Sequence, residues 1–184
     1  MRPYFLLVPA CLLLACNEKI GNDANVQNSS QVLEETNIDT LTNYWPCEYD
    51  TIKSDISIRI DNDYFQLNTY VYSLNDSSIH RFNEAYQKKV YQDIYHNYES
   101  SIYLTGSQDT LLMQILKKEI FKDIFPPEFY QQAVIKSVEY KAVRSNQLFF
   151  HVELIVPDTD WIKSAEMSIF FRTSKKGRLS VISS

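Results

Sequence analysis

The side chains with the clearest spacing for chemistry are His96 and Glu99, which stand three residues apart. On a helix this spacing would place both groups on one face, as in the inverted zinc-protease pattern. That pattern needs a second histidine directly after the glutamate, and Ser100 stands there. On a strand the two side chains would point to opposite faces. We therefore expect His96 to be a surface or packed histidine.

Cys47 and one of the histidines, His80, His96 or His151, would form a nucleophile–base pair if the fold brought them together. The tryptophan–proline pair just before the cysteine belongs to no protease signature that would support this chemistry. We expect Cys47 to be a small buried hydrophobic residue. A reactive thiol and an intermolecular link are the alternatives.

Two acidic turns resemble calcium loops in their first positions only. An EF-hand loop needs oxygen ligands at positions one, three and five and glycine at position six. The turns that start at Asp61 and Asp158 carry Phe65 and Ile162 at position five, and neither has the glycine. We interpret both as solvated turns and expect no metal.

Other catalytic templates are also missing from the sequence. No serine lies in a Gly-x-Ser-x-Gly elbow, and three glycines (Gly21, Gly106 and Gly177) are too few for a phosphate-binding loop. We expect no catalytic residue of these types and no cofactor. Carboxylates are numerous, but the sequence does not set their separation, so a hydrolase that uses a carboxylate pair stays an alternative.

The elements that would position any site begin after residue 15. The eleven residues Tyr4–Leu14 are apolar but too few to cross a bilayer, which takes roughly 20. A basic start, a short apolar run and small residues indicate a secretory signal. The end of the run, Leu13-Leu14-Ala15-Cys16, resembles the lipobox of bacterial lipoproteins. The resemblance implies cleavage before Cys16 and lipidation of its thiol; an ordinary secretory signal is the alternative.

This assignment predicts a signal peptide at 1–15, a lipidated cysteine with a flexible polar tether at 16–43, and one globular domain at 44–184. The membrane partner is bound through Cys16, at the cell envelope and at the outer membrane rather than the inner one. Cleavage removes Arg2 and leaves 17 basic against 23 acidic side chains, a net charge of −6. The basic residues form no stripe, so no nucleic-acid partner is expected.

The globular part alternates polar and apolar residues between turn signals. This pattern predicts hairpins from 51–60 with 64–74, from 100–104 with 110–116 and from 134–143 with 148–156, followed by strands at 161–173 and 179–182. The fold class expected is α+β, mainly β: one antiparallel sheet of seven to eight strands with a short helical insertion near 117–133. Residues 75–88 form either a helix or an excursion with a little helix, which we favour, before a strand near Val90.

Thirteen tyrosines suit half-buried sheet positions, or an exposed platform for a protein or glycan ligand. Thr40, Thr51 and Thr110 each follow an aspartate and precede an aliphatic residue. This pattern resembles the O-glycosylation acceptor of Bacteroidetes, and we expect modification at these three threonines.

Four stretches resemble small lipoproteins of unknown function from Bacteroides-type gut bacteria: residues 72–77, 96–99, 144–146 and 156–160. The likeness spans roughly residues 45–184 and implies an envelope location, but no catalytic residues. The leading hypothesis is a lipid-anchored, non-enzymatic binding or assembly module. The alternative is a hydrolase that acts on envelope polymer or polysaccharide.

Overall fold

The computed structural model describes residues 39–86, 89–107, 109–171 and 177–183. Strands account for about 66% of it, and they form three sheets rather than the single sheet predicted. Among these residues, no helix has the length and apolarity needed to span a bilayer. The predicted signal peptide, Cys16 and most of the predicted tether lie outside the described residues.

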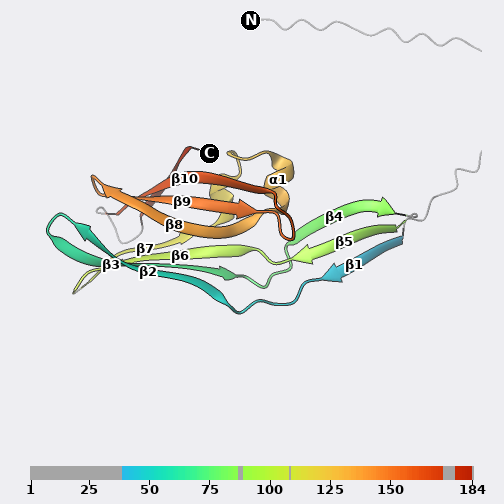
Figure 1. Cartoon of the computed structure of the whole chain (residues 1–184), viewed down its shortest axis with the longest axis horizontal. Helices are drawn as coiled ribbons and strands as arrows, with labels where there is room; N and C mark the ends of the chain where they lie inside the picture. The colour runs from blue at the N-terminus through green and yellow to red at the C-terminus, as the bar shows by residue number, and fades with distance from the viewer. Residues whose placement is uncertain (1–38, 87–88, 108, 172–176, 184) are drawn as a thin grey trace, which may run out of the picture. The chain divides into compact units, whose positions relative to one another are not determined.

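The first sheet has the order β2-β3-β6-β7 and is antiparallel throughout (Figure 1). It contains two of the predicted hairpins, which are confirmed. Residues Asp61 and Asn62 turn the chain in the first of them, and Asp61 has a positive φ of 56°. The strands are β2 (Thr51–Ile60), β3 (Asp63–Ser73), β6 (Tyr98–Thr105) and β7 (Thr110–Leu116).

The second sheet has the order β11-β10-β9-β8 and is also antiparallel. Its central hairpin turns at Ser145 and Asn146, whose φ values of 45° and 68° fit the type I′ turn that favours hairpins. The predicted hairpin and the later strands are thus confirmed. The strands are β8 (Val134–Arg144), β9 (Gln147–Ile155), β10 (Ile162–Phe170) and β11 (Arg178–Ser183).

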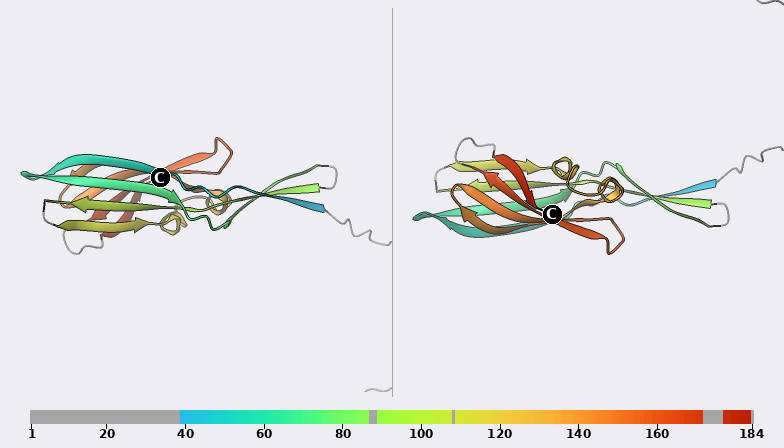
Figure 2. Two further views of the ribbon diagram at one scale, coloured as in Figure 1. Left: turned by 90° about the horizontal axis from the view of Figure 1, so that it is seen from below. Right: turned by 90° about the horizontal axis from the view of Figure 1, so that it is seen from above.

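The core lies between these two sheets, which face each other as a sandwich (Figure 1); seen from below or above, one sheet overlies the other (Figure 2). Alternate residues of each strand point inward, so Leu67, Ile102 and Leu104 meet Phe150 and Val152. Gly177, just before β11, is tightly enclosed here. An added Cβ would lie 2.7 Å from Leu112 Cδ1 and closer still to Ile169 Cγ2.

The predicted short helical insertion is confirmed as two short helical turns between β7 and β8, which connect the two sheets. They are a 3₁₀ helix, η1 (Lys118–Phe121), and an α-helix, α1 (Pro127–Gln132), with Pro127 in its first turn. Phe121, Phe125 and Phe129 of this connection are buried in the core, and neighbouring rings contact one another. Burial of each ring contributes about 1.5–3 kcal/mol. Pro126 and Pro127 separate the two turns, because proline lacks the N–H that a helix interior needs.

One charged side chain is buried in this connection. Lys118 donates a hydrogen bond from Nζ to Ala133 O at 2.9 Å and lies over the Tyr130 ring. Burial lowers the pKa of Lys118, which Glu119 and Asp76 partly offset.

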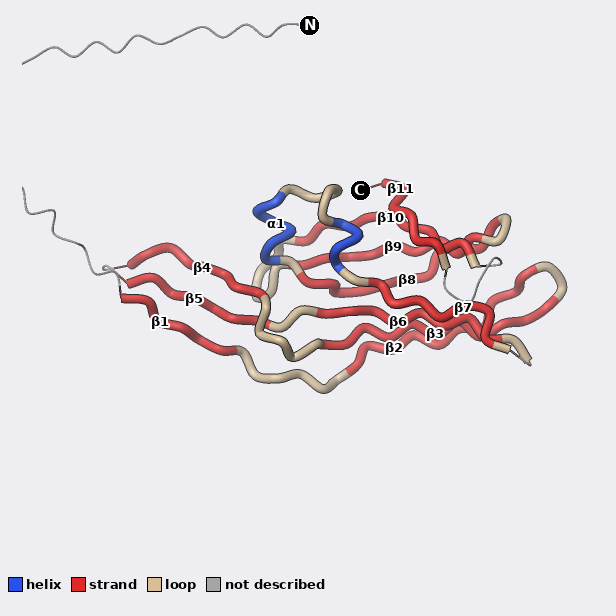
Figure 3. The backbone as a smooth tube through the Cα atoms, turned by 180° about the vertical axis from the view of Figure 1, so that it is seen from behind, coloured by secondary structure: helices blue, strands red, loops and turns tan. Residues whose placement is uncertain are grey.

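The third sheet, called the arm sheet, has the order β1-β5-β4. Its strands are β1 (Asp39–Tyr44), β4 (Ile79–Tyr86) and β5 (Lys89–Tyr95). Figure 3 shows the arm sheet beyond the strand ends of the first sheet. β4 forms where we favoured an excursion with a little helix, so that prediction is wrong, whereas β5 confirms the strand predicted near Val90. The two strands pair antiparallel as a hairpin. β1 pairs parallel with β5, and it begins five residues ahead of the predicted domain start.

The order of neighbouring strands changes between the arm sheet and the first sheet. β3 continues into β4 and β5 continues into β6, while Leu74 N donates to Asn97 O at 2.8 Å between the two paths. β2 lies beside β3, but β1 lies beside β5. Residues 45–50 must therefore pass across this pair of strands, and we call them the crossing segment.

Candidate functional site

A cavity of about 380 Å³ lies under the crossing segment, and we call it the junction cavity. Its walls are mostly apolar. They come from three parts of the fold that are far apart in the sequence: the crossing segment with the start of β2, the chain from the end of β5 to the start of β6, and the start of β8 with the end of β9 and the turn after it. The apolar lining consists of Trp45, Pro46, Ile52, Val134, Ile135, Ile155 and Pro157.

Backbone and ring contacts hold the start of the crossing segment against the arm sheet. Trp45 N donates to Ile94 O at 3.0 Å, which continues the pairing with β5 by one hydrogen bond after β1 ends. The Trp45 ring stacks on Tyr95, with centroids 5.0 Å apart and planes 21° apart. Burial raises the pKa of Tyr95, and the Asp93 charge adds to the shift. These two contacts hold Trp45 in place, and its ring forms one wall of the junction cavity.

The Asn75 side chain binds the backbone of Glu48 in the middle of the crossing segment, and we call this pair of hydrogen bonds the Asn75 clasp. Glu48 N donates to Asn75 Oδ1 at 2.8 Å, and Asn75 Nδ2 donates to Glu48 O at 2.9 Å. Asn75 has a φ of 52°, in the left-handed region that asparagine tolerates better than most residues. Both backbone groups of Glu48 are therefore satisfied by one side chain 27 residues away.

The Glu48 carboxylate also has a hydrogen-bond partner. The Tyr98 hydroxyl donates a hydrogen bond to it. Burial raises the pKa of Tyr98 well above its usual range, and the hydrogen bond and charge of Glu48 raise it further. Tyr98 therefore keeps its proton as a donor, and the Glu48 carboxylate is occupied as its acceptor.

His96 provides a buried hydrogen-bond donor in the wall of the junction cavity. The side chain is only 6% exposed, and its Nδ1 accepts a hydrogen bond from Ser77 N at 3.0 Å. An Nδ1 that accepts leaves the proton on Nε2. Nε2 is buried and has no hydrogen-bond partner among the residues described. A buried donor without a partner is unfavourable by about 1–3 kcal/mol, so a ligand that accepts from it would be stabilised.

The loop that places His96 is itself held by Asp76. Its carboxylate accepts hydrogen bonds from Asn97 N at 2.9 Å and Ser78 N at 3.2 Å. Burial would raise the pKa of Asp76, but these hydrogen bonds more than offset that effect and lower it.

The charges around the junction cavity are mainly negative. Glu48, Asp50 and Asp158 line it together with Lys136, so three carboxylates against one ammonium leave two net negative charges. Lys136 Nζ lies 3.3 Å from Glu153, which further reduces its effect on the cavity. Asp50 makes no hydrogen bond or ion pair with any residue that the structure describes.

The catalytic candidates considered from the sequence are not brought together. His96 is packed, which is one of the two positions expected for it, and Glu99 binds Lys117 at 3.0 Å instead of pairing with it. The other two histidines have separate partners: His80 contacts Gln92, and His151 contacts Glu166. Among the described residues, no three or more histidine, cysteine, aspartate or glutamate side chains are placed so that they could hold a metal ion.

Cys47 is exposed, so the prediction that it is buried is wrong. It lies on the crossing segment, where Trp45, Pro46 and Glu48 line the junction cavity and Cys47 does not. The three threonines expected to be glycosylated, Thr40, Thr51 and Thr110, lie in or at the start of β1, β2 and β7 with exposed or half-exposed side chains.

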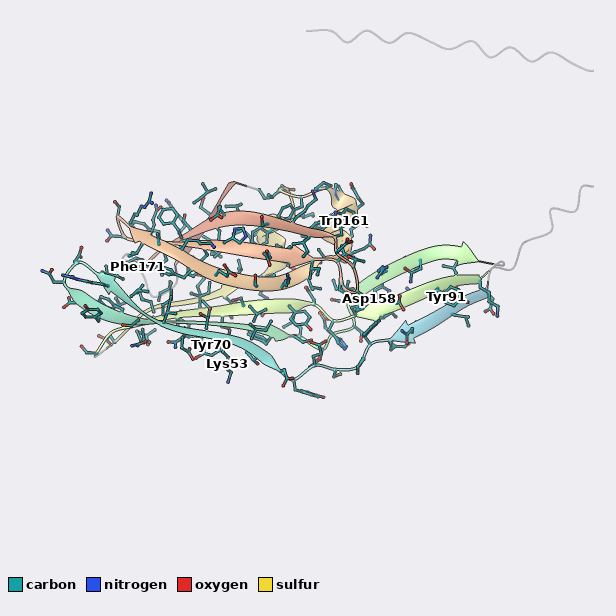
Figure 4. The ribbon with its side chains drawn as sticks, viewed as in Figure 1. Lys53, Tyr70, Tyr91, Asp158, Trp161 and Phe171 are labelled. Atoms are coloured by element: carbon teal, nitrogen blue, oxygen red, sulfur yellow. The ribbon has the colours of Figure 1, made fainter. Side chains whose placement is uncertain are left out.

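Several tyrosines occupy half-buried sheet positions, as expected. Tyr70 and Tyr103 meet edge to face on the outer side of the first sheet, with centroids 6.0 Å apart, and Tyr72 lies near them beside Ser101. Figure 4 shows Tyr70 with Lys53 on this outer side. The surface is shallow and open and contains no buried polar atom without a partner, unlike the junction cavity.

Sequence reasoning missed the main residues of the junction cavity. Trp45, Glu48 and Asp50 belong to a short segment without a periodic pattern, and Tyr95 falls in the strand predicted near Val90, where nothing marked it as a cavity residue. A tryptophan and proline just after a polar stretch was the one local signal available.

A family model described as "Domain of unknown function (DUF4738)" matches residues 32–181, which cover most of the chain and the whole junction cavity. No curated protein matches the sequence.

Proposed function

From the premise that this chain belongs to the DUF4738 family of uncharacterised domains, we propose that it is a non-enzymatic binding module whose ligand occupies the junction cavity. The observation that carries this proposal is the buried Nε2 donor of His96 without a described partner, set in a concave and mostly apolar wall. Ligand pockets commonly combine apolar walls with a few polar groups. The engaged state of Glu48 also favours binding over acid–base catalysis.

Retention of ligand by matched variants tests this function. The full chain would be immobilised and exposed to membrane and polysaccharide fractions. Trp45→Ala should abolish specific retention because Trp45 forms a cavity wall. Tyr49→Ala is the control, since Tyr49 is 85% exposed on the same segment and does not line the cavity. Retention that Trp45→Ala leaves unchanged would contradict the proposal.

The binding module is attached to the bacterial cell envelope by lipid on Cys16, at the outer membrane. The support is the lipobox-like sequence at 13–16, since two or more acyl chains anchor a protein stably. Phase separation in detergent tests this part. The chain should partition into the detergent phase and Cys16→Ser into the aqueous phase; equal partitioning would refute the anchor.

A hydrolase is the second candidate, because three carboxylates line one cavity. Asp50 and Asp158 would then be the pair that acts on the polymer. Breakdown of a retained ligand by the chain, and its loss in Asp50→Asn with binding kept, would favour the enzyme over the binding module.

A further inference from the structure

The edge of the sandwich next to the junction cavity is open. β2 is an edge strand, and in the described part of the chain it pairs only with β3. Ile52 lies opposite Val71, which is 3% exposed, so Ile52 also points toward the space between the sheets. It is nevertheless 59% exposed, because the second sheet does not cover the start of β2.

A second cavity, of about 290 Å³, fills this uncovered space, and we call it the side groove. It runs between two edge strands, β2 and β8. Ile52, Ile56 and Val71 line one wall, and Val138 and Tyr140 line the other. Ile52 also lines the junction cavity, so the two hollows meet at this side chain.

We infer that the side groove binds an extended peptide along the free edge of β2, and that this peptide inserts a basic side chain into the junction cavity. The inference rests on the proposed function and names its ligand. An unpaired edge offers backbone N–H and C=O groups in the spacing of a strand, and an added strand satisfies them. Alternate side chains of such a strand would face the apolar groove.

Charge selects the side chain that enters the junction cavity. The residues that line it carry two net negative charges, and Asp50 has no cationic partner among the described residues. The Arg81 guanidinium, which donates to Pro157 O and Asp158 O next to this lining, offsets one of these charges and leaves one net negative charge. A lysine or arginine side chain has an apolar stem that suits the walls formed by Trp45 and Pro157, and its charged end would reach the carboxylates. The Nε2 donor of His96 cannot bind an ammonium, but it can bind a backbone carbonyl of the same peptide.

Calorimetric titration of the full chain with two blocked octapeptides tests the inference. Both alternate valine and threonine; one has lysine at its fourth position and the other has norleucine. We expect the lysine peptide to bind about tenfold more tightly. Asp50→Asn should reduce this preference to about twofold. Ile52→Ser should weaken both peptides about fivefold, because it removes the apolar contact where the hollows meet.

Ile182→Ser is the control, since Ile182 is a comparably exposed isoleucine on β11, at the opposite edge of the second sheet. It should change neither affinity. Equal affinities for the two peptides, or affinities that Ile52→Ser leaves unchanged, would overturn the inference. Binding of the neutral glycan cellohexaose without binding of either peptide would overturn the inference too. The proposed function would still be supported in that case if Trp45→Ala abolished retention of the ligand.

Discussion

The Asn75 clasp gives the sharpest test of how the crossing segment is held. Asn75→Ala removes two hydrogen bonds to the Glu48 backbone, each worth about 0.5–1.5 kcal/mol. It also places an alanine at a φ of 52°, which is unfavourable by about 1–2 kcal/mol. We expect the free energy of unfolding to fall by about 2–4 kcal/mol, the lower part of the combined range, because the hydrogen bonds are partly exposed.

Asn75→Gly separates the two contributions, because glycine adopts the left-handed region without strain. It should lower the free energy of unfolding by about 1 kcal/mol less than Asn75→Ala. Urea denaturation followed by tryptophan fluorescence measures both, and Asn62→Ala, in an exposed turn, is the control, expected within about 0.5 kcal/mol of the parent. Equal values for the two Asn75 variants would refute the backbone reasoning, and values near the parent would refute the clasp.

Three further perturbations follow from other described contacts. Gly177→Ala should lower the thermal midpoint by an amount equivalent to about 1–3 kcal/mol, whereas Gly106→Ala, whose added Cβ would meet only a phenylalanine ring at 3.2 Å, should change it little; equal effects would contradict the packing at Gly177. Lys118→Ala should reduce stability by about 2–4 kcal/mol in the same assay, because Ala133 O loses its donor and the buried stem is lost; an unchanged midpoint would contradict this. The raised pKa of Tyr98 favours its neutral form in the folded state, so stability should fall as pH rises above about 10, where unfolded tyrosine ionises; Tyr98→Phe should flatten this part of a pH–stability curve, and an unaltered slope would refute the assignment.

The hairpins of the two large sheets could be predicted because their turns contain residues that tolerate positive φ, such as Asp61 and Asn146. The number of sheets could not. Alternation shows that Leu67 and Phe150 point inward, but it gives the same pattern whether they share one sheet or face each other across two. Distribution of the strands between sheets depends on contacts between residues far apart in sequence.

The arm sheet was missed for a local reason. Ser77 and Ser78 look like a helix cap, and Phe82, Tyr86 and Val90 follow at helical spacing. The pairing of β4 with β5 overrides that pattern. β1 has few apolar residues and pairs with a strand 50 positions later, so nothing near it in sequence indicates its partner.

The candidate site was predictable only in part. The sequence excluded His96 from a zinc-protease or cysteine-protease template, because neither template was complete, but it left open whether the side chain is packed or exposed. Its role in the junction cavity depends on Ser77, which fixes the protonated nitrogen from 19 residues away. Trp45 and Asp50 reach the same cavity because the chain crosses between β1 and β2, and that path has no signature in the sequence.

The parallel pairing of β1 with β5 has a mechanical consequence. β1 starts at Asp39 and runs toward the crossing segment, so tension applied from the N-terminal side along the strand loads its backbone hydrogen bonds in shear. They would have to rupture together and could not open one after another, as in a peeled hairpin. The arm sheet can therefore resist a pulling force at this end. The stacking of Trp45 and the hydrogen bonds of Asn75 hold the chain just after β1 and add a second point of resistance.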